Sequence, residues 1–100
     1  MTLWRIADDA AWVDSASDRI VVMNLATQEQ PQALLGTAAA VWRCLLGPDP
    51  EHPRVSVRED AVIVRLAEEY GAAAEAIARD VTALLNRLSE DGLVDSAPDN

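Results

Sequence analysis

Few side chains in this 100-residue sequence have the types and the spacing that enzyme chemistry requires. His52 is the only histidine, and the sequence indicates no partner that could orient it as a catalytic base, so we expect an exposed loop residue. Cys44 is the only cysteine and lies among apolar residues, where a free cysteine usually behaves as a small buried hydrophobe. No segment has the pattern of a glycine-rich phosphate loop or the spacing of a metal site. We therefore expect no catalytic residue, no metal and no cofactor.

The acidic residues come as adjacent pairs, which point in different directions on a helix and are typical of a solvated surface rather than of an acid/base couple. The pairs are Asp8-Asp9, Glu59-Asp60, Glu68-Glu69 and Glu90-Asp91. With 17 acidic and 8 basic residues, the formal net charge is −9. Such a surface repels phosphate backbones and attracts basic peptides or basic protein patches, so we expect no nucleic-acid partner.

The hydropathy pattern indicates neither membrane insertion nor secretion. No apolar run approaches the roughly 20 residues that span a bilayer, and residues 1–5 lack a basic stretch followed by an apolar one. A lone cysteine cannot form an internal disulfide, so the sequence carries no mark of an oxidising compartment. We expect a cytoplasmic protein without a membrane partner.

The first third of the chain has the composition of β-strands. Residues 11–13 and 20–25 are short runs rich in β-branched and aromatic residues, and the polar cluster between them is typical of a hairpin. A third run spans residues 32–35. Because Pro31 cannot donate a hydrogen bond to a sheet ladder, we expect this third strand, from Gln30 to Leu35, at the edge of an antiparallel sheet.

Three helices are expected after Gly36. The first begins at Thr37 and ends at Gly47-Pro48. The second follows Ser56-Val57-Arg58-Glu59, which matches a capping box, and ends at Gly71. Within the first helix Trp42 follows the apolar spacing and is expected in the core, whereas Trp4 and Trp12 could contact either the core or a partner.

The third helix, from about Ala72 to Gly92, has the strongest apolar periodicity in the chain. Three strands followed by three helices predict an α+β fold, winged-helix-like, with one three-stranded antiparallel sheet followed by a three-helix bundle. We expect one domain over residues 1–95 and a frayed tail over 96–100. The apolar stripe of the third helix comprises Ile77, Val81, Leu84, Leu85 and Leu88.

Three segments, taken in this order, carry a resemblance to a known family. They are Thr-Ala-x-x-x-Trp from Thr37, Leu-Ala-x-x-Tyr from Leu66, and Asp-Val-x-x-Leu-Leu-x-x-Leu-x-x-x-Gly-Leu-Val from Asp80. The series resembles the PqqD-like family, the RiPP recognition elements, over about residues 10–95. Its length and its alanine- and arginine-rich composition look most like the stand-alone leader-binding proteins of lasso peptide pathways.

The resemblance implies a non-catalytic function. The leader segment of a ribosomally synthesised precursor peptide would add as a strand beside the third strand and lie against the third helix, in the mode of β-augmentation. The protein would deliver this leader to a leader peptidase and a cyclase of the same pathway. The residues expected to bind the leader are Gln30, Gln32, Ala33, Leu34 and Leu35 of the strand and Ala76, Asp80, Ala83, Leu84 and Arg87 of the helix.

Within this expected site, four residues would form the walls of an apolar pocket for the tyrosine and proline anchors that the resemblance implies, with Asp80 and Arg87 at its rim. The pocket walls would be Leu34, Ala76, Ala83 and Leu84. The alternative for this rim is a plain solvated face with an internal ion pair.

The alternative function is a winged-helix DNA-binding regulator, because a shared core does not fix function. A basic recognition stripe is not evident, since the third helix offers Arg79 and Arg87 among acidic residues.

Overall fold

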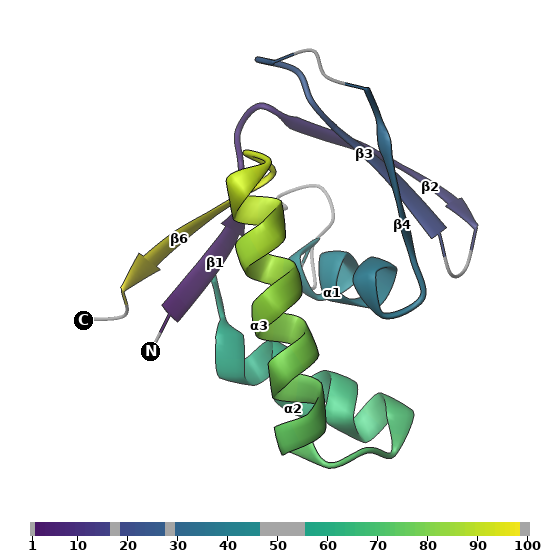
Figure 1. The fold of residues 1–100 in the computed structure, drawn as a ribbon, viewed down its shortest axis with the longest axis vertical. Helices are drawn as coiled ribbons and strands as arrows, with labels where there is room; N and C mark the ends of the chain where they lie inside the picture. The colour runs from purple at the N-terminus through teal and green to yellow at the C-terminus, as the bar shows by residue number, and fades with distance from the viewer. Residues whose placement is uncertain (1, 17–18, 28–29, 47–55, 99–100) are drawn as a thin grey trace.

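The computed structural model describes residues 2–16, 19–27, 30–46 and 56–98, which fold into two antiparallel three-stranded sheets and three helices (Figure 1). The α+β class is confirmed, but the prediction of one sheet followed by a helical bundle is wrong, because a second sheet joins distant parts of the chain. The elements are β1 (Thr2–Ile6), β2 (Ala10–Ala16), β3 (Arg19–Asn24), β4 (Gln32–Leu35), α1 (Thr37–Leu46), β5 (Val57–Arg58), α2 (Glu59–Tyr70), α3 (Ala74–Glu90) and β6 (Val94–Pro98).

The first sheet has the strand order β2-β3-β4 and contains the three strands that the sequence predicts. Its register places Ile20 opposite Leu34, and both side chains are buried against the helices. The alternation of side chains therefore sends every second residue of each strand into the core. β4 pairs with β3 on one side only, so its expected position at the sheet edge is confirmed, although the strand begins at Gln32 rather than Gln30.

The second sheet has the order β5-β1-β6 and corrects two predictions. Val57 and Arg58 pair with β1, so the chain is extended up to Glu59, and α2 begins without a side-chain hydrogen bond at its N-cap, Arg58. The capping box predicted from Ser56 is thus wrong. The expected tail is also ordered as far as Pro98, because β6 pairs along the whole of β1; residues 99–100 lie outside the described residues.

The helices follow the predicted pattern with small shifts at their ends. α2 ends at Gly71, whose φ of 61° lies in the left-handed region that glycine adopts without strain. α3 runs from Ala74 to Glu90 and buries the expected apolar stripe, with Leu84 only partly buried. The predicted end of the first helix at Gly47, and His52, lie outside the described residues.

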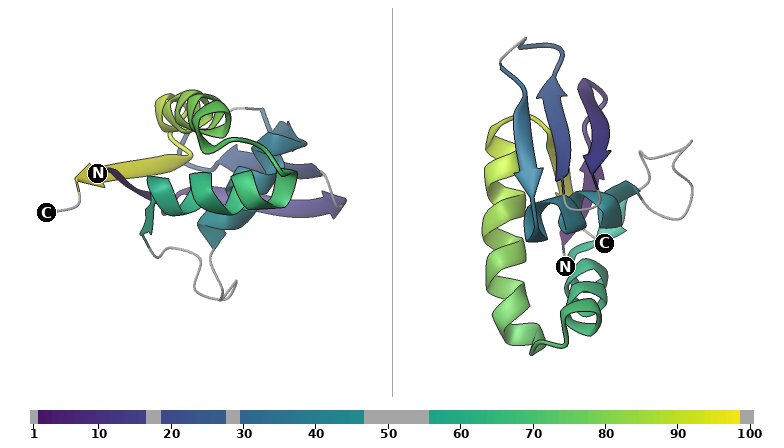
Figure 2. Two further views of the ribbon diagram at one scale, coloured as in Figure 1. Left: turned by 90° about the horizontal axis from the view of Figure 1, so that it is seen from below. Right: turned by 90° about the vertical axis from the view of Figure 1, so that its right-hand side faces the viewer.

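A single cluster of buried side chains connects both sheets with the three helices. Figure 2 shows how these elements are arranged. Trp42 is fully buried, as expected, and the ring of Trp12 packs edge-on against it with 6.0 Å between ring centroids. Trp4 is only 4% exposed and its indole N–H donates to Glu59 Oε1 at 3.3 Å, so Trp4 belongs to the core. Cys44 is also buried, as expected.

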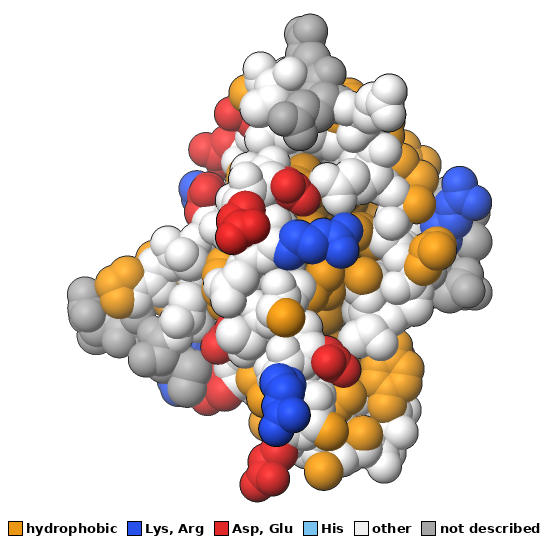
Figure 3. All heavy atoms as spheres, in the orientation of Figure 1, with side chains coloured by type: hydrophobic (Ala, Val, Ile, Leu, Met, Phe, Trp, Pro, Cys, Tyr) orange, Lys and Arg blue, Asp and Glu red, His pale blue; other side chains and the backbone are white. Residues whose placement is uncertain are grey.

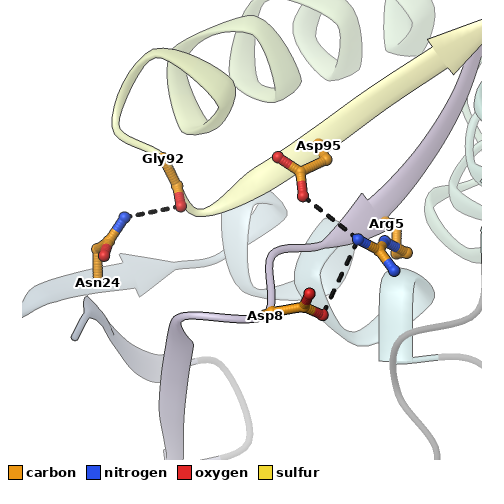
Figure 4. Close-up of polar contacts among 5 residues, drawn as sticks. All are labelled: Arg5, Asp8, Asn24, Gly92 and Asp95. Atoms are coloured by element: carbon orange, nitrogen blue, oxygen red, sulfur yellow. Dashed lines mark hydrogen bonds and ion pairs between the residues drawn. The ribbon is translucent and has the colours of Figure 1, made fainter. Parts of the chain in front are cut away.

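Polar contacts near the end of α3 involve both sheets (Figure 4). At the end of β3, the Asn24 Nδ2 donates to the carbonyl oxygen of Gly92 at 2.9 Å, and its Oδ1 accepts from the backbone N–H groups of Ala26 and Thr27. Nearby, the Arg5 guanidinium lies between the carboxylates of Asp8 and Asp95. The Asn24 bond therefore joins the β2-β3-β4 sheet to the end of α3, whereas the Arg5 ion pairs join β1 to β6 and to the turn after β1.

Candidate functional site

The unpaired edge of β4 is the first component of the candidate site. Residues 32–35 use one edge of their backbone to pair with β3, and the other edge has no strand beside it among the described residues. The side chains alternate, so that Leu34 is 1% exposed and Leu35 is 60% exposed. Such an edge carries N–H and C=O groups that can pair with an added extended peptide.

One face of α3 is the second component. Residues 80, 84, 87 and 91 are spaced by four, three and four, so their side chains share one side of the helix and its C-terminal cap. Asp80 and Arg87 are exposed, Leu84 is half-buried against the core, and Asp91 is half-buried just beyond the last turn. We call these four residues the α3 stripe.

Side-chain hydrogen bonds show that the α3 stripe faces β4. The Gln32 Nε2 donates to Asp91 Oδ2 at 3.0 Å, and the Arg87 guanidinium donates to Gln32 Oε1 at 3.4 Å. The backbones of α3 and β4 make few close approaches, whereas α1 packs directly on β4. The space between α3 and β4 is therefore bridged at one end by long polar side chains.

The two components also match in length and direction. In Figures 1 and 2, β4 and α3 lie on the same side of the molecule and run in opposite directions. The four residues of β4 extend about 10 Å, and the interval from residue 80 to residue 87 of α3 rises about 10 Å. With Gln32 at Arg87, the other end of β4 lies level with Asp80. Figure 3 shows hydrophobic side chains along this interval, with charged side chains of both signs beside them.

Most of the predicted site residues lie around this space, but not all in the same way. Gln30 is exposed and precedes β4, and Ala33 is exposed on the strand. Leu34 faces the core, so it can contribute to the floor of a binding site and not to an open wall. Ala76 is exposed and shares a shallow depression with Asp80.

Ala83 lies toward the other side of α3. It lines a depression together with Ala78, Thr82 and Asn86, and Thr82 contacts Glu59 at the start of α2. A pocket that includes both Leu34 and Ala83 as walls therefore stays a prediction. The expected alternative of an ion pair within the rim has no counterpart among the described salt bridges, because Arg87 instead contacts Gln32.

Sequence reasoning missed Asp91, which fixes the Gln32 side chain. The sequence predicts it only as one member of an acidic pair on the solvated surface, yet it is half-buried. Its spacing of four from Arg87 could have placed it on the same side of the helix. The sequence likewise predicts Glu59 on the solvated surface, but its Oε1 accepts hydrogen bonds from Trp4 and Thr82.

The chemistry of this surface is that of polar and apolar contacts. Within residues 2–16, 19–27, 30–46 and 56–98, no three potential metal-ligating side chains cluster. Burial raises the pKa of the Cys44 thiol above its ordinary value of 9.0, and Glu69 adds to this shift while Arg65 opposes it. A buried thiol held protonated in this way is a poor nucleophile. In the same ranges, no helix has the length and apolar character needed to cross a membrane.

Comparisons with known proteins give a family and a similar fold. The sequence profile of the family described as "Coenzyme PQQ synthesis protein D (PqqD)" matches residues 19–94. Among solved structures, TbiB1 in complex with the TbiA(beta) leader peptide has a TM-score of 0.76 to this chain at 20% sequence identity, over 95% of this chain and 99% of that chain. At this identity the likeness shows the fold. No match was found among curated proteins.

Proposed function

The chain belongs to the PqqD family, and from this membership we propose that it recognises the leader segment of a ribosomally synthesised precursor peptide without catalysing a reaction itself. The observation that carries the proposal is the unpaired edge of β4 beside the α3 stripe. The similar fold of TbiB1, which is in complex with a leader peptide, supports the same assignment.

The proposed binding mode is strand addition to β4. Backbone groups of the edge would provide affinity that depends little on leader sequence, and contacts to the side chains of α3 would provide specificity. In the added strand, every second side chain points to the inner side of the sheet, toward the α3 stripe. Apolar leader side chains would contact Leu84, and polar or charged ones would contact Asp80 and Arg87. A few apolar anchors together with backbone pairing give micromolar affinity or tighter, about −8 kcal/mol.

The narrower proposal is that the leader belongs to a lasso peptide precursor, and that this cytoplasmic protein presents it to a leader peptidase and a cyclase. Its support is the length and the alanine- and arginine-rich composition of the chain, which look most like those of stand-alone leader-binding proteins of lasso peptide pathways. Residues 1–95 would form the binding domain, and the three helices would correspond to a winged-helix core. No observation favours the alternative of DNA binding, because Arg79 and Arg87 of α3 lie among acidic residues.

Proline substitution on β4 tests the binding mode. Successive strand residues direct their N–H groups alternately to the two edges, so one of Gln32→Pro and Ala33→Pro removes a donor to β3 and the other a donor to the free edge. Gln32→Ala serves as the control for loss of that side chain. We expect the proline variant that retains the higher melting temperature to lose leader binding at least tenfold in isothermal titration. Normal binding by both folded proline variants would refute strand addition.

The contribution of the α3 stripe is tested by Asp80→Ala and Arg87→Ala. Both side chains are exposed, so each substitution should change the free energy of unfolding by less than about 1 kcal/mol. Leader affinity should fall by about 1–3 kcal/mol, the range for a charged hydrogen bond at an interface. Arg65→Ala is the matched control, since it removes the same charge from an exposed position on α2, in a depression that no residue of α3 lines. Unchanged affinity in both stripe variants would assign this face to ordinary solvated surface.

A further inference from the structure

A polar bridge closes one end of the space between β4 and α3. We call it the clasp; it consists of Gln32, Arg87 and Asp91. The Gln32 Nε2 donates to Asp91 Oδ2 at 3.0 Å, and the Gln32 Oε1 accepts from the Arg87 guanidinium at 3.4 Å. Gln32 and Leu34 are two residues apart on one strand, so both side chains point to the inner side of the sheet. An amide can lie on the side that Leu34 buries because both of its ends have a partner.

The position of Asp91 is not explained by the helix that it ends. Asp91 is the C-cap of α3, where the helix dipole is negative, so a carboxylate there is electrostatically unfavourable. Glu90, directly before it, adds a second negative charge. The bond to Gln32 gives this half-buried carboxylate a partner and holds the amide with its Nε2 turned toward Asp91. Asp91 thereby orients the Gln32 amide, and its Oε1 is left to accept from Arg87.

The clasp presents hydrogen-bond donors to the space beside it. The Gln32 Nε2 has a second N–H besides the one that Asp91 accepts, and the Arg87 guanidinium has further N–H groups besides the one that Gln32 accepts. The Asp91 carboxylate already accepts from Gln32, and its negative charge balances the positive charge of Arg87. The peptide side chain that fits this chemistry is one that accepts hydrogen bonds, which means a carboxylate or a carboxamide.

The next inner position along β4 offers the opposite chemistry. Leu34 is 1% exposed, and Leu84 of α3 is half-buried against the same core. Residues that lie directly opposite one another on paired strands direct their side chains to the same face. A leader residue opposite Leu34 would therefore contact apolar side chains, and a leader residue opposite Gln32, two positions away, would contact the clasp.

We propose that the clasp fixes the register of the bound leader, with Asp91 as a positioning residue that acts through Gln32. The leader residue opposite Gln32 is Asp, Glu, Asn or Gln, and the leader residue opposite Leu34 is apolar. A slip by one residue turns both side chains to the other face of the sheet, and a slip by two places an apolar side chain against the clasp. The inference rests on the proposed function and names the leader pattern that the site selects.

A positional scan of the leader tests this pattern. The probes are fluorescein-labelled synthetic copies of the leader segment in which each residue in turn is replaced by Leu or by Gln, two side chains of similar size. Fluorescence anisotropy measures the Kd of each peptide. With the wild-type chain, we expect one position at which Gln binds about tenfold or more tightly than Leu, and a position two residues away at which Leu binds more tightly than Gln. Gln32→Leu should abolish the preference for Gln.

Three variants at the end of α3 test the role of Asp91. Asp91→Ala should reduce the preference for Gln about fivefold, because the Gln32 amide is no longer held in place. Asp91→Asn should retain the preference within twofold, since its Oδ1 can accept the same hydrogen bond from Gln32. Glu90→Ala is the matched control, because it removes the same charge from the neighbouring, exposed end of α3, and it should leave the preference unchanged.

A uniform loss of affinity for all peptides in Asp91→Ala, with the preference for Gln unchanged, would give Asp91 a purely structural role and overturn the proposal. A wild-type chain that binds the leader without any position preferring Gln would also overturn it, as would a preference that persists in Gln32→Leu. Failure of the proposed function is distinguishable, because the wild-type chain would then bind none of the peptides, and both proposals would fall. A preference that is lost in Gln32→Leu, reduced in Asp91→Ala and kept in Asp91→Asn supports the clasp.

Discussion

Asn24 is expected to hold the β2-β3-β4 sheet against the end of α3, and its substitution separates two contributions to stability. Its Nδ2 donates to Gly92 across the joint, and its Oδ1 accepts two N–H groups of the turn that follows β3. Asn24→Ala removes all three hydrogen bonds. Asn24→Asp keeps the acceptor for the turn but removes the donor to Gly92 and directs a carboxylate oxygen toward that carbonyl.

The magnitudes follow from the exposure of each bond. The bond to Gly92 is partly buried, so its loss should cost about 1–1.5 kcal/mol, and the two bonds of the exposed turn should add about 0.5 kcal/mol each. Asn24→Ala should therefore destabilise the fold by about 2–2.5 kcal/mol and Asn24→Asp by about 1–1.5 kcal/mol. For a domain of this size, 1 kcal/mol corresponds to about 4–8 °C in melting temperature.

Thermal melts and urea denaturation followed by far-ultraviolet circular dichroism measure both variants. An Asn24→Asp protein that melts within about 2 °C of the wild type would contradict a stabilising bond to Gly92. Equal destabilisation by Asn24→Asp and Asn24→Ala would instead show that the two hydrogen bonds of the turn do not contribute to stability. Because the joint sets the spacing between β4 and α3, folded Asn24→Asp should also bind leader more weakly than the wild type in isothermal titration.

Three further outcomes are expected. Gly92→Ala should lower the free energy of unfolding by about 2–3 kcal/mol in chemical denaturation, because φ is 73° and a Cβ would lie 2.5 Å from Asn24 Nδ2. Gly71→Ala, at φ 61° with open space around it, should lower it by about 1 kcal/mol. Equal losses in the two variants would contradict a role of the close approach to Asn24. Because burial raises the pKa of the Cys44 thiol above 9.0, the thiol ionises at a lower pH in the unfolded chain than in the folded one, and stability should fall as pH rises above 9.0. A Cys44→Ala protein whose stability depends on pH in the same way would exclude this cause. Because the net charge is −9, the association rate with a basic leader should fall as the salt concentration rises. A rate in stopped-flow fluorescence that does not depend on salt would show that charge does not steer the leader.

Local patterns identified the elements whose signals lie within one segment. Residues 20–25 and 32–35 are read as strands from their composition, and α3 is read from the 3.6-residue period of its buried stripe. The β5-β1-β6 sheet could not be found in this way. β5 has two residues, and its strand conformation exists only because Leu3 and Trp4, more than fifty positions away, supply its hydrogen-bond partners.

The candidate site shows the same division. Helical spacing predicts that residues 76, 80, 83 and 87 lie near one another, but it does not say which side of this set faces the sheet. That rotation is fixed by burial of Val81 and Leu85 in the core, which turns Arg87 toward Gln32 and leaves Ala83 beside Thr82.

By itself, the sequence determined that the chain forms an acidic α+β protein with an edge strand, a strongly amphipathic third helix and the segments of the PqqD family. The tertiary structure alone decided that β4 and the α3 stripe face each other, that Asp91 positions Gln32, and that the unbroken apolar run of β3 has one uncovered side. The physical reason is that periodicity and composition are properties of neighbouring residues. The relative placement of two elements depends instead on how their apolar faces pack into one shared core, to which residues across the whole chain contribute.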